Sequence, residues 1–94
     1  MDKRVLTRHP EGKSGVNISK PKYDAVREGI VQSLSADGDM AYSALAKAVE
    51  QGLRGFDGSI RWYVEAVKLD LEARGVIERV PGTRPQLLRL VETR

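Results

Sequence analysis

The stretch DGSIRWYVEAVKLDLEARGVIERVPGTRPQLLRLV, residues 57–91, decides the fold. Its first half carries apolar residues every three or four positions, at Ile60, Val64, Val67 and Leu71. This spacing predicts one continuous helix over residues 57–75, with Gly75 as a left-handed C-cap because glycine has no Cβ. The second half holds two β-rich runs on either side of the proline-containing segment 81–85, which predicts an antiparallel hairpin over residues 76–91.

Two shorter helices are predicted upstream. Residues 20–35 form the first, since their apolar side chains again follow helical spacing, at Tyr23, Val26, Ile30 and Leu34. Residues 44–51 form the second, after Ser43 as N-cap and before Gly52 as a stop signal. The segment 40–42 between the two helices is long enough only for a very short strand.

The N-terminal residues are basic and show little periodicity. Residues 1–19 contain Pro10, Gly12 and Gly15, so we expect an arm with one short strand near residues 16–18. Residues 20–94 then form the domain, because a chain of 94 residues has room for one core. The apolar residues predicted to supply this core are Val26, Ile30, Leu45, Val49, Ile60, Val64, Val67, Leu71, Ile77, Leu88 and Leu90.

The order of these elements predicts the fold class. An α+β domain in which three helices precede a C-terminal β-hairpin wing has the element order of a winged helix-turn-helix. The run from Arg61-Trp62-Tyr63-Val64 through Lys68 to Gly82 also resembles the third helix and wing of a group of small bacterial winged-helix proteins without assigned function. That resemblance implies the winged-helix fold and brings no catalytic residue or ligand with it.

Composition excludes several classes of protein. The chain has no cysteine, which excludes disulfide frameworks, thiolate metal sites and thiol nucleophiles. The single histidine, His9, has no suitable ligands or catalytic partner nearby in the sequence, and no cofactor fingerprint is present. We therefore expect no enzyme, no cofactor and no metal site. No apolar run has the length of a membrane span or of a signal peptide, so we expect a cytoplasmic protein without membrane contact.

Positive charge gathers at the two ends of the chain. Residues 1–22 carry six Lys or Arg against two acids and residues 76–94 carry four against two, whereas residues 23–75 carry six against nine acids. Basic ends favour a polyanionic partner such as double-stranded DNA. The leading hypothesis is a DNA-binding regulator that holds phosphates with the following residues of the third helix and the wing: Arg61, Lys68, Arg79, Arg84 and Arg89.

Two features qualify this hypothesis. In this hypothesis the basic residues of the arm and of the start of the first helix extend the same phosphate contacts, although a basic tail is often disordered; they are Lys3, Arg4, Lys13, Lys20 and Lys22. On the third helix, the stripe Arg61, Glu65, Lys68 and Glu72 alternates in sign, so a solvated face of salt bridges explains it without any ligand.

The alternative hypothesis is a winged-helix domain for dimerisation or protein contact, without nucleic-acid binding. Its support is the acidic middle of the chain and a second apolar stripe on the third helix, roughly opposite the core face. This stripe consists of Trp62, Ala66, Leu69 and Ala73. Either the chain itself covers it, through the arm near residues 16–18 or a strand of the hairpin, or a partner subunit in a homodimer does.

Overall fold

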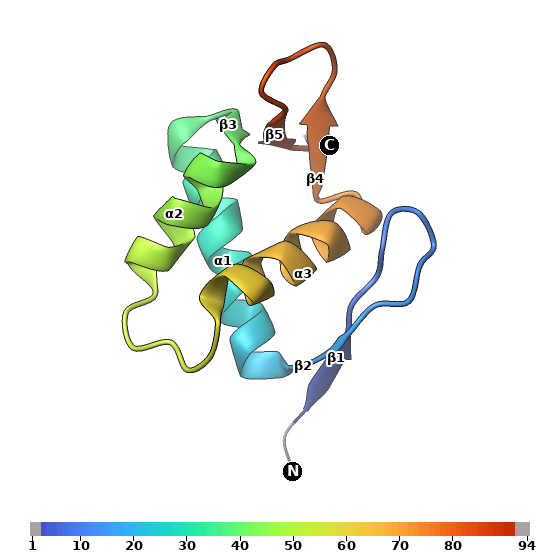
Figure 1. Ribbon diagram of the computed structural model, residues 1–94, viewed down its shortest axis with the longest axis vertical. Coiled ribbons are helices and arrows are strands. Elements are labelled where there is room, and N and C mark those ends of the chain that lie inside the picture. The colour runs from blue at the N-terminus through green and yellow to red at the C-terminus, as the bar shows by residue number, and fades with distance from the viewer. Residues whose placement is uncertain (1–2, 92–94) are drawn as a thin grey trace.

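The computed structural model describes residues 3–91, so residues 1, 2 and 92–94 of the expected arm and domain lie outside it. The fold is α+β, as predicted, with three helices and two small antiparallel sheets (Figure 1). The elements are β1 (Arg4–Leu6), β2 (Asn17–Ser19), α1 (Lys20–Asp37), β3 (Met40–Ala41), α2 (Tyr42–Gly52), α3 (Ile60–Ala73), β4 (Ile77–Val80) and β5 (Leu87–Leu90). None of the described helices is long and apolar enough to cross a bilayer.

The two sheets lie at opposite ends of the chain. Strands β4 and β5 form the predicted antiparallel C-terminal hairpin, paired from Ile77↔Leu90 to Val80↔Leu87. Strand β3 joins the free edge of β5, which makes β5 the central strand of three. Strands β1 and β2 pair with each other, with Val5 opposite Ile18. This N-terminal hairpin (residues 3–19) contains the strand expected near residues 16–18 and adds β1, which the sequence did not indicate.

The helix ends differ from the predicted ones by a few residues. Helix α3 begins at Ile60 rather than at residue 57, because Gly58 adopts a φ of 110° that no helix contains. It ends at Ala73, and Gly75 has the left-handed φ of 76° expected of a cap. Helix α2 begins at Tyr42, ahead of the predicted cap Ser43, because the pairing of β3 with β5 stops at Ala41 and releases the chain. Helix α1 runs two residues beyond its predicted end.

The core lies where α1, α2 and α3 meet the C-terminal hairpin. All of the predicted core residues are buried except Ile60 and Leu90, which are half-buried and pack against the others. The structure adds Ile18 of β2, which is fully buried. The N-terminal hairpin therefore contributes to the same core as the helices.

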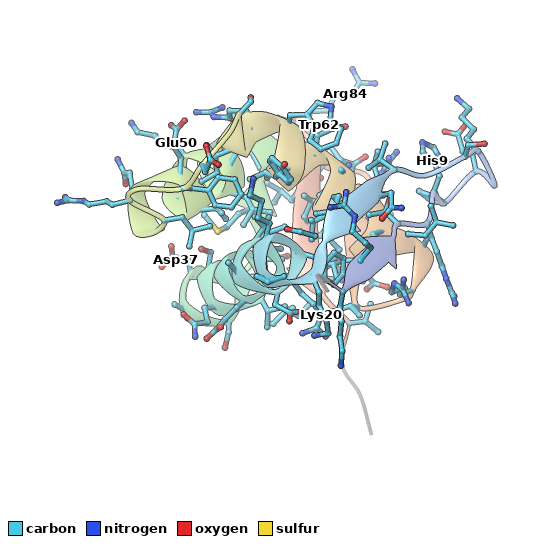
Figure 2. All side chains as sticks on the ribbon, turned by 90° about the horizontal axis from the view of Figure 1, so that it is seen from below. His9, Lys20, Asp37, Glu50, Trp62 and Arg84 are labelled. Carbon is cyan, nitrogen blue, oxygen red and sulfur yellow. The ribbon has the colours of Figure 1, made fainter. Side chains whose placement is uncertain are left out.

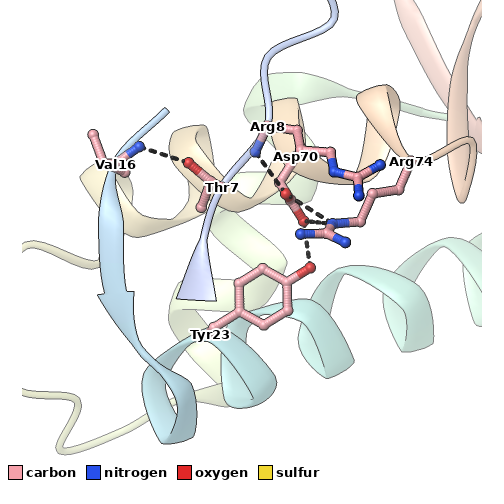
Figure 3. Close-up of polar contacts among 6 residues, drawn as sticks. All are labelled: Thr7, Arg8, Val16, Tyr23, Asp70 and Arg74. Atoms are coloured by element: carbon pink, nitrogen blue, oxygen red, sulfur yellow. Dashed lines mark hydrogen bonds and ion pairs between the residues drawn. The ribbon is translucent and has the colours of Figure 1, made fainter. Parts of the chain in front are cut away.

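A buried carboxylate fixes the N-terminal hairpin to the helices (Figure 3). Asp70 of α3 is 0% exposed. It accepts hydrogen bonds from the backbone N–H of Arg8 at 2.8 Å, from the Tyr23 hydroxyl of α1, and from Nε of Arg74 at 2.8 Å. One side chain thus joins the end of β1, the start of α1 and the last turn of α3.

The closing of the hairpin also depends on a glycine. The Thr7 N–H donates a hydrogen bond to the Val16 carbonyl oxygen at 2.9 Å, and the Thr7 hydroxyl oxygen accepts one from the Val16 N–H at 2.8 Å. A Cβ at the neighbouring Gly15 would lie 1.8 Å from the Thr7 carbonyl oxygen. Only glycine lets the two sides of the loop come this close.

Replacing the carboxylate tests how much of the fold it holds. Asp70→Ala leaves the Tyr23 hydroxyl and the Arg8 amide without their partner, so we expect the free energy of unfolding to fall by about 2–4 kcal/mol in urea titrations. The matched control is Asp57→Ala, because the Asp57 side chain is 98% exposed, and it should change stability by less than about 0.5 kcal/mol. Equal effects of the two substitutions would refute the anchoring role of Asp70.

Alkaline pH offers a second test. Burial, and then the hydrogen bond to Asp70, raise the pKa of Tyr23 from 10.0 to about 12. A phenol whose folded pKa is raised contributes stability that is complete below pH 10 and is lost as the pH rises towards 12. The free energy of unfolding should therefore fall more steeply between pH 10 and 12 in the wild type than in Tyr23→Phe. Parallel curves for the two proteins would contradict this.

Candidate functional site

The cations predicted to contact phosphate from α3 are paired inside the domain. Arg61 lies 3.5 Å from Glu50 of α2, and Lys68 lies 2.8 Å from Glu72. The Lys68 side chain is only 11% exposed, and its Nζ also sits 5.6 Å from the centre of the Tyr42 ring. Lys68 is therefore committed to packing between α2 and α3.

Of the ion pairs predicted along the charged stripe of α3, Lys68–Glu72 forms, whereas Arg61 pairs with Glu50 of α2. The expectation of a solvated face is wrong at the second half of the stripe. Glu72 keeps only 6% of its side chain exposed, because Lys68 and Arg79 of β4 both contact it. At the first half, Glu65 lies next to the Tyr42 hydroxyl. Burial, and then this carboxylate, raise the pKa of Tyr42 to about 12.

The three arginines of the C-terminal hairpin divide into two kinds. Arg79 lies 3.3 Å from Glu72, and Arg89 lies 2.6 Å from Glu78 on the neighbouring strand. Arg84 lies in the exposed turn between the strands and makes no ion pair with any residue in the described range 3–91. Of the five phosphate contacts predicted on α3 and the C-terminal hairpin, Arg84 alone is both exposed and without a carboxylate partner in that range.

The basic residues of the two hairpins do not join into one patch. The loop of the N-terminal hairpin reaches the start of β4 (Figure 1), where Pro10 and Glu11 line a hollow with Glu72, Glu78 and Arg79. Three carboxylates thus separate the two groups of cations.

The cations at the start of α1 are also engaged. Lys20 lies 2.5 Å from Asp24, and Lys22 lies 5.7 and 5.2 Å from the ring centres of Phe56 and Tyr63. Lys22 therefore holds the turn between α2 and α3 against α1.

An apolar groove runs along the outer side of α3. The stripe Trp62, Ala66, Leu69 and Ala73 forms one wall, and the residues on either side of the N-terminal hairpin's loop, mainly 7–9 and 14–16, form the other. Two adjoining hollows, of about 170 and 460 Å³, make up what we call the hairpin–α3 groove.

The chain covers this stripe only in part. Ala66, Leu69 and Ala73 are half-buried, whereas Trp62 remains 48% exposed. Figure 2 shows Trp62 projecting from α3 and His9 on the loop of the hairpin. Leu6 of β1, which borders the larger hollow, is 68% exposed. One of the two expectations was that the arm itself covers the stripe. The arm does contact the stripe, but it leaves Trp62 open to solvent.

Sequence reasoning did not identify the residues that place the hairpin beside α3. Asp70 and Tyr23 carry a weak signal, since Asp70 interrupts the core-facing side of α3 between Val67 and Leu71 and has Arg74 four residues later. An acid at such a position needs a buried partner. No sequence pattern pointed to Arg8, because it contributes a backbone amide.

No group of three or more His, Cys, Asp or Glu residues within residues 3–91 is placed to hold a metal ion. The acids around Glu72 described above lie with Arg79, which neutralises part of their charge. Within residues 3–91, the two surface features that we consider further are the hairpin–α3 groove and the exposed turn at Arg84.

Comparison with known proteins identifies the family. The model of a family of unknown function, DUF6958, matches residues 4–88. The chain belongs to the DUF6958 family. The match begins at β1 and ends within β5, so both walls of the hairpin–α3 groove lie inside the region that defines DUF6958. No curated protein and no solved structure matches this DUF6958 chain.

The exposure of Trp62 predicts a small cost for removing it. Because about half of the side chain is in water, Trp62→Ala should lower the free energy of unfolding by about 1–2 kcal/mol, against 3–5 kcal/mol for a fully buried aromatic residue. Thermal and urea unfolding of this DUF6958 variant measure the difference. A loss above about 3 kcal/mol would show that Trp62 is covered, by the chain or by a second copy.

Proposed function

We propose that this protein is a winged helix-turn-helix module that binds another polypeptide through the hairpin–α3 groove. The winged-helix part of the proposal is supported by the element order, in which three helices precede the C-terminal hairpin, and by the addition of β3 to the central strand β5. One fold hosts many activities, so the choice of ligand has to come from the surface.

The observation that carries the polypeptide proposal is the chemistry of the open side of α3. Its exposed and half-buried outer residues are mostly apolar, with Trp62 the largest. Of its two cations, Lys68 is buried against Glu72, whereas Arg61 pairs with Glu50 at 3.5 Å on the surface, with about half of each side chain exposed. A base-reading helix presents hydrogen-bond donors and acceptors to the edges of bases, and this face offers few.

The position of the N-terminal hairpin supports the same conclusion. A helix with its side chains is about 10–12 Å across, and the major groove of DNA is about 12 Å wide. The hairpin lies along one side of α3, where it shares hollows with Trp62, Leu69 and Ala73. A neighbour on this flank leaves less room for α3 to enter the major groove lengthwise.

Selection from a random peptide display library on the immobilised full-length chain tests the proposal. We expect peptides to be enriched on the wild type and lost on Ala66→Arg, because an arginine at this position fills the groove. The control is Ala36→Arg, the same substitution at an exposed position of α1, and it should retain the peptides. No enrichment, or equal enrichment on the two variants, would refute the proposal.

Nucleic-acid binding is the second candidate, and it is favoured by the exposed guanidinium of Arg84 at the tip of the C-terminal hairpin, which makes no ion pair within residues 3–91. A single such contact supports only non-specific affinity, with a Kd of about 10⁻⁴ to 10⁻⁶ M that weakens with salt. Titration of mixed-sequence duplex DNA at two salt concentrations measures this. We expect binding no tighter than that range.

The variants separate the roles of the hairpin's arginines. If the C-terminal hairpin holds phosphates, Arg84→Ala should make the salt dependence of DNA affinity shallower. Arg79→Ala and Arg89→Ala should change this salt dependence less than Arg84→Ala does, because carboxylates already pair with these two arginines. Nanomolar, salt-sensitive affinity that depends on all three arginines would make DNA binding the better account.

A further inference from the structure

The size of the smaller hollow limits what can occupy it. It measures about 170 Å³ and is lined on the α3 side by Trp62, Ala66 and Leu69. Sites for small molecules typically measure about 300–1,000 Å³. The smaller hollow lies below this range and suits one large side chain, whereas the larger hollow, at about 460 Å³, lies within it. The stripe from Trp62 to Ala73 extends the groove to roughly 16 Å at about 1.5 Å per residue.

The charge beside the groove comes from the N-terminal hairpin. Residues 3–19 carry four Lys or Arg against one acid, Glu11, and two of these cations, Arg8 and Lys13, line the groove. Arg8 lines both hollows. Its backbone N–H bonds to Asp70, whereas its guanidinium makes no ion pair with a residue in the described range. Lys13 lies 3.4 Å from Glu11, with both side chains about two-thirds exposed. Such an exposed pair contributes about 0–1 kcal/mol, so Lys13 can exchange partners.

One acid, Glu65, lines the smaller hollow from the α3 side. It keeps its negative charge, because the Tyr42 hydroxyl beside it is neutral. The hairpin side of the groove is thus cationic, and its α3 side is apolar apart from Glu65.

A second copy of the chain is a poor match for this surface. In a two-fold symmetric contact the same patch meets itself. Two grooves facing each other would bring two cationic hairpins together, each with four Lys or Arg against one acid. The matching partner has the opposite charge.

We propose that the hairpin–α3 groove binds an acidic segment of another polypeptide, which inserts one large apolar side chain beside Trp62 and places its carboxylates against Arg8 and Lys13. This inference rests on the proposed polypeptide-binding function and specifies its partner. The apolar wall supplies the contact area, and the cations of the hairpin select the sign of the charge on the partner.

Tryptophan fluorescence of the full-length chain provides the test, because Trp62 is its only tryptophan. The probes are three short synthetic peptides: a central Leu flanked by Asp and Glu, the same peptide with Ala for Leu, and the same peptide with Lys for the acids. The acidic Leu peptide should shift the emission to shorter wavelength as the indole leaves water. The other two should bind at least roughly tenfold more weakly.

Two charge reversals locate the effect. Arg8→Glu changes the guanidinium and keeps the backbone N–H that bonds to Asp70, so the hairpin should stay docked while affinity for the acidic peptide falls by roughly tenfold or more. Lys47→Glu makes the same change on the exposed side of α2 and should leave the affinity unchanged. Equal losses in both variants would show a non-specific charge effect and overturn the inference.

The remaining outcomes separate this inference from the function on which it rests. Equal binding of the acidic and basic peptides overturns the acidic partner and leaves polypeptide binding intact. A dimer in sedimentation that Ala66→Arg converts to monomer shows that the occupant is a second copy. Duplex DNA that shifts the Trp62 emission, and loses this effect in Arg8→Glu, replaces the polypeptide with nucleic acid. Failure of all three peptides overturns the inference, and the display selection then decides whether polypeptide binding itself stands.

Discussion

The carboxylate of Asp70 is the contact on which the position of the N-terminal hairpin depends. Removing a charge from water is costly, and here donors from three segments offset that cost: a backbone N–H at the end of β1, a phenol of α1 and the guanidinium of Arg74. No buried side-chain nitrogen or oxygen in the described part of the chain lacks a partner. With Ile18 of β2 buried in the core, this carboxylate holds the hairpin against α3, and the groove between them follows from that docking.

The same docking shapes the proposed function. In a helix-turn-helix the outward side of the last helix is the surface available for a ligand. Here the N-terminal hairpin takes up one flank of α3, and carboxylates on α2, α3 and β4 pair with most of the cations that α3 and the C-terminal hairpin present. What stays open is apolar and lies beside a cationic hairpin. Such a surface suits an acidic polypeptide segment better than it suits a regular duplex, whose backbone would bring phosphates close to these carboxylates.

The sequence predicted what depends on local periodicity and missed what depends on contacts between distant residues. Three helices, the C-terminal hairpin and most of the core followed from apolar spacing, and Gly75 followed from the need for a left-handed cap. The start of α3 was placed too early, because Asp57 and Gly58 belong to a turn rather than to a helix. Strand β1 pairs with β2 across 11 to 15 positions, and the bond from Arg8 to Asp70 joins residues 62 positions apart. No pattern within a short window reports such a contact, and the ion pairs of Arg61, Arg79 and Arg89 were missed for the same reason.

Native-state hydrogen exchange at the Arg8 amide tests directly whether Asp70 docks the N-terminal hairpin as part of the cooperative fold. This N–H lies just beyond strand β1 and bonds only to the Asp70 carboxylate. If Asp70 docks the hairpin as part of the cooperative fold, the Arg8 amide should be protected with an opening free energy close to that of the core amides of α3, such as Val67 and Leu71. Exchange of Arg8 at the rate of an unstructured chain, while those α3 amides remain protected, would show that the hairpin opens independently and would contradict the account.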